Sequence, residues 1–458
     1  MSDRAGRILD FQHPNQLRDL IKNSLQVNHD AADLATVLDD VEALLSYCVK
    51  TGHPRFFNQL SQGLDIVCMS GEWLTSLTNA NMFTYEIAPV FTLMEEMMIK
   101  KLISHIGWKN GDGIFAPGGA ISNLYAILLA RYNKFPQIKT QGIYPYKQLA
   151  CFTSKQAHYS IKRSACISGI GTNNVYYIDC NREGEMIPSD FERKVQQAIA
   201  EDKIPFFVSC TAGTTVMGAF DPIKEFAGIC EKYNIWLHID GAWGGGVFIL
   251  KEFRHLIDGI ELADSATWNP HKALGATLQC SAFLVKQENI LENCNSMAAD
   301  YLFQKDKHYD TAYDTGDKTI QCGRHNDILK LWMMWKAKSR VIILTTYRYL
   351  QSELVRREGF IPLIEKPHYL NVCFWYLPKA MRHMNPEGES SQEKIKINSI
   401  APRIKALMME RGTVMVGYQP LDNWPNFFRM IVSNQSSTRE DIDFLLDTIE
   451  EYGEEIVI

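Results

Sequence analysis

The chain has 458 residues, 46% hydrophobic and 22% charged, which suits two or three domains with buried cores and excludes a disordered protein. Its net charge of −6, with both signs interspersed, gives no basic field for nucleic acid or anionic lipid. The cysteines form no CxxC pair, zinc spacing or dense disulfide framework, as is typical of a reducing compartment. Without a signal-peptide pattern or a membrane-length apolar run, we expect a cytoplasmic protein with no membrane span and no metal site.

The first predicted element is a helical segment over about 14–50. Its apolar side chains recur at helical spacing, at Leu34, Leu38, Val41, Leu44 and Leu45. A helical segment with one apolar face can pack on a neighbouring domain or on another subunit.

The central region, from about 112 to 285, alternates short apolar runs with helical stretches. The predicted strands are 149–153, 175–178, 205–209, 235–240, 265–268 and 281–285. This alternation indicates βαβ units and an α/β fold whose mostly parallel sheet is covered on both faces. In such sheets the ligand lies beyond the carboxyl ends of the strands.

The last part of the chain has a different pattern, with a predicted helix at 329–338, a strand at 371–376, a helix at 400–411 and a strand-like run at 426–433. A polar cluster at 385–391 is typical of a surface loop. We expect a small α+β domain over 328–458, a large domain over 61–327 and an N-terminal helical segment over 1–60.

A glycine turn precedes a predicted helix in the large domain. Gly118 and Gly119 let backbone N–H groups converge, and the helix dipole adds positive potential, so a phosphate can bind there. A Gly-Gly pair before a helix is nevertheless more often a simple turn.

Three polar side chains follow predicted strands of the same region. Asp240 ends one strand, Lys272 follows another within a Trp-Asn-Pro-His-Lys segment, and His158 follows a third. Taken singly, the aspartate could cap a turn, the lysine could be incidental, and the histidine could be a surface or core residue. Together with the glycine turn they supply what pyridoxal 5'-phosphate (PLP) needs: a phosphate cradle, a stacking ring, an anion for the pyridine nitrogen and an amine.

At this point the sequence resembles the group II PLP-dependent amino acid decarboxylases. It is most similar to the animal glutamate decarboxylases, with the cysteine sulfinate and aspartate decarboxylases near. The matching motifs are Thr51–Ser61, Phe83–Pro89, Pro117–Asn123, Trp268–Lys272, Tyr313–Lys318, Gly417–Pro420 and Phe427–Arg429. The resemblance implies the type I aminotransferase-like fold and a homodimer whose active sites are shared at the subunit interface, with residues 1–60 packing on the partner.

The resemblance also implies roles for individual residues. Lys272 would form the Schiff base, Asp240 would hold the pyridine nitrogen and His158 would stack on the ring. The other residues implied around the cofactor are Gly118, Gly119, Ala120, Ser122, Thr215, Ala242, Asn269 and His271.

Substrate contacts are implied for Gln59, Leu60, Ser61, Phe83 and Arg429. A guanidinium can bind a substrate carboxylate bidentately, although the sequence by itself favours an ordinary surface salt bridge for the arginine.

Tyr309 matches the tyrosine that protonates the α-carbon in the family, and a phenol with a pKa near ~10 can donate a proton at neutral pH. The alternative is a solvated, charged loop without a chemical role.

We therefore expect α-decarboxylation of L-glutamate to 4-aminobutanoate and CO2. Aspartate or cysteine sulfinate is the alternative substrate within the same chemistry. A catalytically silent PLP-binding paralogue or an aminotransferase is the alternative class of protein.

Two departures from the family pattern stand out. Gly241 replaces a usual alanine, and the stretch 339–370 is shorter than in the family, which could affect packing around Arg429 and hence activity.

Overall fold

A computed structural model describes residues 4–338 and 344–456, except for the side chains of residues 344 and 345. These described residues form two compact units. The large unit is Asp65–Val341 with Lys366–Tyr369, and the small unit is Met1–Leu64, Ile342–Glu365 and Leu370–Ile458. The N-terminal residues thus share a unit with the C-terminal strands, whereas the sequence suggested a separate segment.

A seven-stranded sheet forms the centre of the large unit, in the order β2-β8-β7-β6-β5-β3-β4. The strands are β2 (Asp112–Phe115), β3 (Leu149–Ser154), β4 (Val175–Ile178), β5 (Ile204–Thr211), β6 (Trp236–Gly241), β7 (Ser265–Trp268) and β8 (Ala282–Val285). β8 alone runs antiparallel to its neighbours. The expected α/β fold with a mostly parallel sheet is confirmed.

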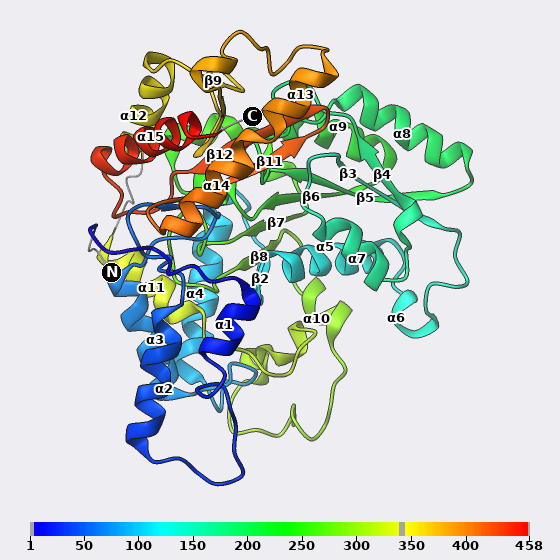
Figure 1. Cartoon of the computed structure of the whole chain (residues 1–458). Coiled ribbons are helices and arrows are strands. Elements are labelled where there is room, and N and C mark those ends of the chain that lie inside the picture. Colours follow the sequence, from blue (N-terminus) through cyan, green and yellow to red (C-terminus); the bar gives the residue numbers. More distant parts are fainter. Residues whose placement is uncertain (1–3, 339–343, 457–458) are drawn as a thin grey trace. The chain divides into compact units, whose positions relative to one another are not determined.

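Helices cover both faces of this sheet. Figure 1 shows α5 (Gly119–Lys134) and α7 (Ser160–Ile167) on one side, and α8 (Pro188–Ala200) and α9 (Ile223–Tyr233) on the other. The buried faces of α8 and α9 carry Phe191 and Phe226, whose rings stack 4.9 Å apart. Because both faces are covered, the strands are apolar along their length, which explains their continuous hydrophobic runs.

Three further helices of the large unit are α3 (Ile66–Thr78), α4 (Pro89–Ile106) and α11 (Ile328–Ala337). α11 is the helix that we expected in the small domain. It packs against α3 so closely that a Cβ on Gly71 would lie 2.6 Å from Lys330 Cα. This contact is long-range, so the local pattern could not reveal which unit the helix joins.

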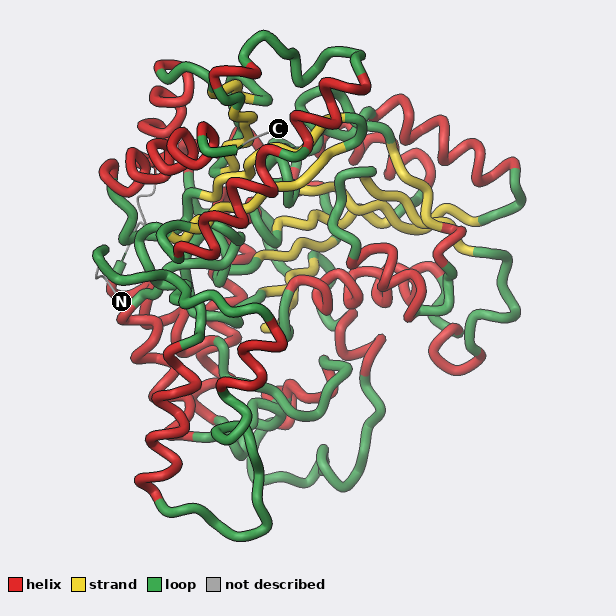
Figure 2. Tube along the Cα trace, viewed as in Figure 1, coloured by secondary structure: helices red, strands yellow, loops and turns green. Residues whose placement is uncertain are grey.

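Between α10 (Ile290–Asn295) and α11 the chain is mostly loop, with short 3-10 turns (Figure 2). The short helix α6 (Ile138–Gln141) precedes β3. No described helix is long and apolar enough to cross a membrane.

The small unit contains a five-stranded sheet in the order β1-β11-β12-β10-β9. Its strands are β1 (Phe56–Phe57), β9 (Phe360–Pro362), β10 (Asn371–Tyr376), β11 (Met415–Leu421) and β12 (Trp424–Ile431). Its later helices are α12 (Leu344–Arg356), α13 (Ser391–Asn398), α14 (Ile400–Arg411) and α15 (Arg439–Glu454). Of the stretch expected to be shortened, 339–343 lie outside the described residues.

The predicted helical segment 14–50 forms two helices, α1 (Pro14–Leu20) and α2 (Leu34–Ser46). Polar residues separate them, and Asp33 caps α2 by accepting a hydrogen bond from the backbone N–H of Thr36 at 2.8 Å. A side chain that satisfies the first N–H groups begins a new helix rather than continuing an old one.

Candidate active site

A cavity of about 250 Å³ lies in the large unit. Its lining residues follow the carboxyl ends of β2, β3, β5, β6 and β7, which all run in the same direction. They are Pro117, Gly118, Gly119, Ala120, Asn123, His158, Thr211, Gly213, Thr215, Asp240, Ala242, Trp243, Asn269, His271 and Lys272. The structure therefore brings together ten of the eleven residues that the sequence assigned to a cofactor. The eleventh, Ser122, is fully buried behind the turn.

The glycine turn enters α5 at one end of this cavity. Gly118 has φ +93°, a conformation that L side chains rarely adopt. A Cβ on Gly119 would lie 2.8 Å from Nδ2 of Asn269. Since Ser281 Oγ donates to Asn269 Oδ1 at 2.6 Å, the amide keeps its NH2 toward the turn. Backbone and side-chain N–H groups thus converge at a helix N-terminus, as anion binding requires.

Asp240 is 4% exposed at the end of β6. Its Oδ2 accepts from Asn123 Nδ2 at 2.7 Å, and its Oδ1 accepts from the backbone N–H of Ala242 at 3.1 Å. The surroundings of the next residue, Gly241, leave little space for a side chain. A Cβ there would lie 2.6 Å from Phe248 Cζ, so the phenylalanine ring occupies the space of an alanine methyl group.

His158 is half-buried after β3, with its Nδ1 2.9 Å from Ser160 Oγ. Burial lowers the pKa of this imidazole, although Asp240 opposes the shift. The ring is therefore neutral at pH 7 and can lie against a planar ligand without adding charge.

Lys272 is also half-buried, and its neighbour His271 is buried with a pKa lowered to about 4. Burial is the main cause of that shift. A neutral histidine beside the lysine adds no positive charge that would oppose an ammonium group there.

The residues around the cavity fit PLP. Thr211 pairs in register with Asp240 across β5 and β6, and its Oγ1 is buried with no hydrogen-bond partner among the described residues. An unmatched buried hydroxyl beside a buried carboxylate indicates that a polar ligand completes the site. A phosphate at the glycine turn and a ring nitrogen at Asp240 would match the two charged ends.

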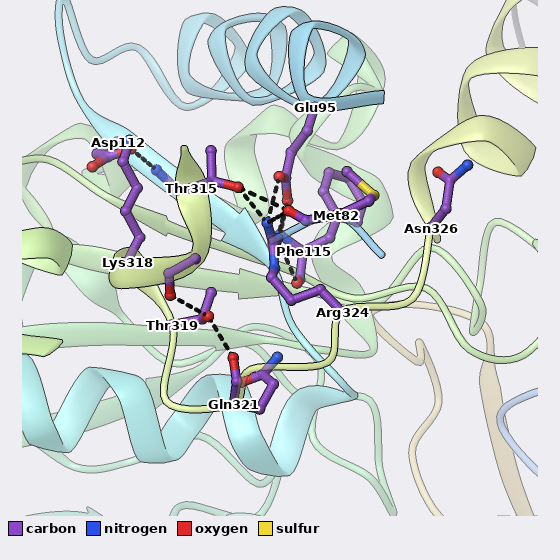
Figure 3. Close-up of polar contacts among 12 residues, drawn as sticks. Met82, Glu95, Asp112, Phe115, Thr315, Lys318, Thr319, Gln321, Arg324 and Asn326 are labelled. Carbon is purple, nitrogen blue, oxygen red and sulfur yellow. Dashed lines mark hydrogen bonds and ion pairs between the residues drawn. The ribbon is translucent and has the colours of Figure 1, made fainter. Parts of the chain in front are cut away.

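A buried ion pair holds the chain just before the glycine turn (Figure 3). Arg324 Nη1 and Nη2 donate to the Glu95 carboxylate at 3.0 and 2.5 Å, and Glu95 Oε1 also accepts from the backbone N–H of Phe115 at 2.8 Å. Arg324 further donates to the carbonyl of Met82 and to Thr315 Oγ1. One guanidinium therefore connects α4, the end of β2 and the loop before α11.

Tyr309 lies in the large unit but does not line the described cavity. Its hydroxyl donates to Asp314 Oδ1 at 2.9 Å, and its ring lies 5.0 Å from that of Tyr85. Burial is the main cause that raises the pKa of the phenol, which therefore holds its proton at neutral pH. Phe83, also outside the lining, accepts a hydrogen bond at its carbonyl from the N–H of Gly316 at 2.7 Å.

The other predicted substrate residues form a group in the small unit. Arg429 on β12 donates from Nη2 to the backbone carbonyl of Asn58 at 3.4 Å, next to the segment Gln59–Ser61. Gln62 Nε2 fixes the end of this segment by donating to the Ile431 carbonyl at 2.7 Å. Burial lowers the pKa of Arg429.

Sequence reasoning missed several lining residues, notably Asn123, Thr211 and Trp243. Asn123 lies four positions after Gly119 on the same helix, so helical spacing could have placed both on one face. Thr211 lies two positions after the predicted strand 205–209 and ends the observed β5, so the strand-end argument made for Asp240 applies to it as well.

The fold and the cavity together define a PLP-dependent enzyme. A family model described as "Pyridoxal-dependent decarboxylase conserved domain" matches residues 14–377. The chain therefore belongs to the pyridoxal-dependent decarboxylase family, its cofactor is PLP and it is a carboxy-lyase.

Solved structures agree with this assignment. Mouse CSAD is 44% identical, with a TM-score of 0.95 over 99% of this chain and 95% of that chain. Catharanthus roseus tryptophan decarboxylase, solved with L-tryptophan, is 22% identical with a TM-score of 0.85, covering 99% of this chain and 94% of that one. Oryza sativa TDC, solved with PLP and tryptamine, is 20% identical with a TM-score of 0.87 and the same coverage. The two plant proteins support the fold alone.

Proposed function

We propose that this enzyme removes the α-carboxylate of a small acidic amino acid, with L-cysteine sulfinate as the preferred substrate. The observation that carries the proposal is the 44% identity to mouse CSAD, a cysteine sulfinate decarboxylase, over nearly the whole chain. L-Glutamate, the substrate expected from the resemblance to the animal glutamate decarboxylases, is the second candidate. Glutamate has one methylene more than aspartate or cysteine sulfinate, and a pocket discriminates one methylene by only about 1–3 kcal/mol.

We assign a separate role in this chemistry to each of the residues around the cavity. When bound, PLP supplies an aldehyde that condenses with amines and an electron-withdrawing ring that stabilises the electron pair left by departing CO2. Lys272 provides the amine that anchors the cofactor, and Asp240 keeps a proton on the ring nitrogen. The glycine turn and Asn269 bind the phosphate, and His158 orients the ring.

Two further residues act on the substrate in this proposal. Arg429 binds the side-chain acid of the substrate, because a guanidinium forms strong charge-assisted hydrogen bonds with oxyanions. Tyr309 donates the proton that the α-carbon receives after CO2 has left. The phenol holds its proton at neutral pH, so a proton is available for this step.

A panel of substrates tests the proposed function. Purified PLP-loaded protein is given L-cysteine sulfinate, L-aspartate, L-glutamate and, as a control, L-tryptophan, and CO2 and amine are measured. We expect amines from the acidic substrates, most efficiently from cysteine sulfinate, and none from tryptophan. Keto-acid products would indicate an aminotransferase, and absorbance of bound PLP without CO2 from any substrate would indicate a silent paralogue.

We also propose that the enzyme is a cytoplasmic homodimer with shared active sites and that residues 1–60 pack on the partner. The exposed apolar stripe of α2 supports this, since Leu34, Leu38 and Leu45 are 72%, 57% and 62% exposed. All eleven cysteines are free thiols, which fits a reducing compartment. Leu38→Glu with Leu45→Glu should lower the mass measured by light scattering, and an unchanged mass would remove this stripe from the interface.

A further inference from the structure

Asp240 and His158 are connected by the side chain of Asn123, to which no role has been given so far. Asn123 Nδ2 donates to Asp240 Oδ2 at 2.7 Å and to Ser160 Oγ at 2.9 Å. Ser160 Oγ in turn lies 2.9 Å from Nδ1 of His158. Asn123 and Ser160 are each 1% exposed, so this path from the carboxylate to the imidazole is sealed from solvent.

The hydrogens of this network can be assigned by elimination. An ionised Asp240 only accepts hydrogen bonds, so the NH2 group of Asn123 faces it and Oδ1 must find a donor elsewhere. Two groups can donate to it: His238, whose Nε2 lies 3.0 Å from Asn123 Oδ1, and Thr267, whose Oγ1 lies 3.4 Å from it. Burial lowers the pKa of His238 to about 4, so its ring is neutral with the proton on Nε2.

The far side of His238 agrees with this assignment. Its Nδ1 lies 2.9 Å from Ser265 Oγ and can accept the hydroxyl proton. Ser265 Oγ in turn accepts from Trp236 Nε1, which can only donate, at 2.8 Å. The donors therefore run in one direction, from Trp236 through His238 to Asn123.

The same logic fixes His158. Ser160 Oγ accepts a proton of Asn123, and its other hydrogen-bond partner among the described residues is Nδ1 of His158, which the next contact shows to be an acceptor, so the hydroxyl proton is directed to that nitrogen. The backbone N–H of Ser160 also donates to this nitrogen, at 3.3 Å. Nδ1 is thus an acceptor twice over, and a neutral ring must carry its proton on Nε2.

We propose that Asn123 is a positioning residue that orients the Asp240 carboxylate and, through Ser160, selects the Nε2–H tautomer of His158. The inference rests on the proposed roles of Asp240 and His158. Its consequence is that both PLP-contacting groups are set before the cofactor binds, with Nε2–H as the only donor of the imidazole. Such preorganisation strengthens binding because no group has to reorient when the ligand arrives.

The test uses cofactor-free full-length protein labelled with ¹⁵N-histidine, in which His158→Gln identifies the His158 resonances. We expect a protonated Nε2 and a bare Nδ1 in the wild type. Asn123→Asp places a second carboxylate against Asp240, and its new oxygen accepts the Ser160 proton. Nδ1 of His158 then keeps only the longer contact with the backbone N–H of Ser160, at 3.3 Å, so the Nδ1–H tautomer should appear beside the Nε2–H tautomer. Ser160→Ala should also mix the tautomers and covers the case in which Asn123→Asp does not fold.

PLP affinity, measured by equilibrium dialysis, is the second readout. Asn123→Asp should bind PLP about 10- to 150-fold more weakly, the range for a lost hydrogen bond to a charged group. Ser160→Ala should lose less, because it leaves the contact with Asp240 intact. The matched control is Asn174→Asp, since Asn174 is also buried and donates from Nδ2 to the carbonyl of Ile170 at 2.7 Å. It should change neither readout.

Three results would overturn the inference: an Nδ1–H tautomer in the wild type, an unchanged tautomer in both Asn123→Asp and Ser160→Ala, or equal effects from the control. None of them depends on turnover. The substrate panel on the wild type tests the proposed function separately, so failure of one leaves the other standing.

Discussion

The ion pair between Glu95 and Arg324 gives the sharpest test of how the large unit is held together. The two side chains are 4% and 2% exposed, so neither charge is screened by water. Three donors converge on the Glu95 carboxylate: Nη1 and Nη2 of Arg324 and the backbone N–H of Phe115. In Glu95→Gln the new NH2 group must face one of these donors, and the buried guanidinium loses its counter-charge.

Removing one partner of a buried pair costs about 3–5 kcal/mol, because the remaining charge stays buried and uncompensated. We therefore expect Glu95→Gln to lower the free energy of unfolding by about that amount. The measurement is urea denaturation of cofactor-free protein, which avoids the stabilisation that bound PLP would add. Replacing both partners, in Glu95→Leu with Arg324→Met, should restore part of the loss, because no charge is then left buried.

Asp258→Asn is the matched control, since it removes the charge from an exposed pair in the same unit, with Lys224 3.4 Å away. Exposed pairs contribute little, so its unfolding curve should stay close to that of the wild type. If Glu95→Gln were no more destabilising than Asp258→Asn, the role given to this pair would be wrong.

Three other predictions concern catalysis and pH. Tyr309→Phe should lower amine production about 10²–10⁴-fold without changing the absorbance of bound PLP, and unchanged turnover would remove Tyr309 from the scheme. Arg429→Lys should raise KM for acidic substrates about 10-fold or more, since the bidentate geometry is lost, and steady-state kinetics would show no change if the arginine had another role. Burial lowers the pKa of Lys405 to about 7, so the folded protein binds fewer protons than the unfolded chain between pH 7 and 10.5. Stability relative to Lys405→Met should therefore rise with pH across this window, by up to about 1.4 kcal/mol per pH unit, and a flat difference would contradict the shift.

Local patterns predicted many elements well. The strands 175–178, 265–268 and 371–376 and the helix 400–411 have the expected bounds. These segments are apolar runs or amphipathic stretches whose ends are marked by polar or breaking residues. β2 was missed because its four residues include Gly113, which lacks the side chain that makes a strand recognisable. The reversed direction of β8 was also missed, since strand direction depends on partners far along the chain.

In the candidate site, too, some residues could be predicted from local patterns and others depend on partners far along the chain. Gly118, Asp240 and Lys272 could be predicted because each follows a recognisable element and has a side chain, or lacks one, suited to PLP. Helical spacing places Asn123 on the face of Gly119, but its hydrogen bonds could not be predicted, because its partners Asp240 and Ser160 are 117 and 37 positions away. An asparagine in a helix has no distinctive local pattern, and only the folded structure shows what its amide joins.

The polar groups buried near Asp240 form a hydrogen-bonded network that fixes its carboxylate. An unpaired buried carboxylate costs several kcal/mol, but here it accepts two hydrogen bonds, and the amide that donates one of them is itself held by His238. A fully satisfied network in a low-dielectric interior has one favourable arrangement, because turning any member leaves at least two groups unmatched. The Asp240 carboxylate, which we propose binds the pyridine nitrogen, is thus held in place by groups that need not contact substrate. Mutations among these groups should alter cofactor binding before they alter substrate choice.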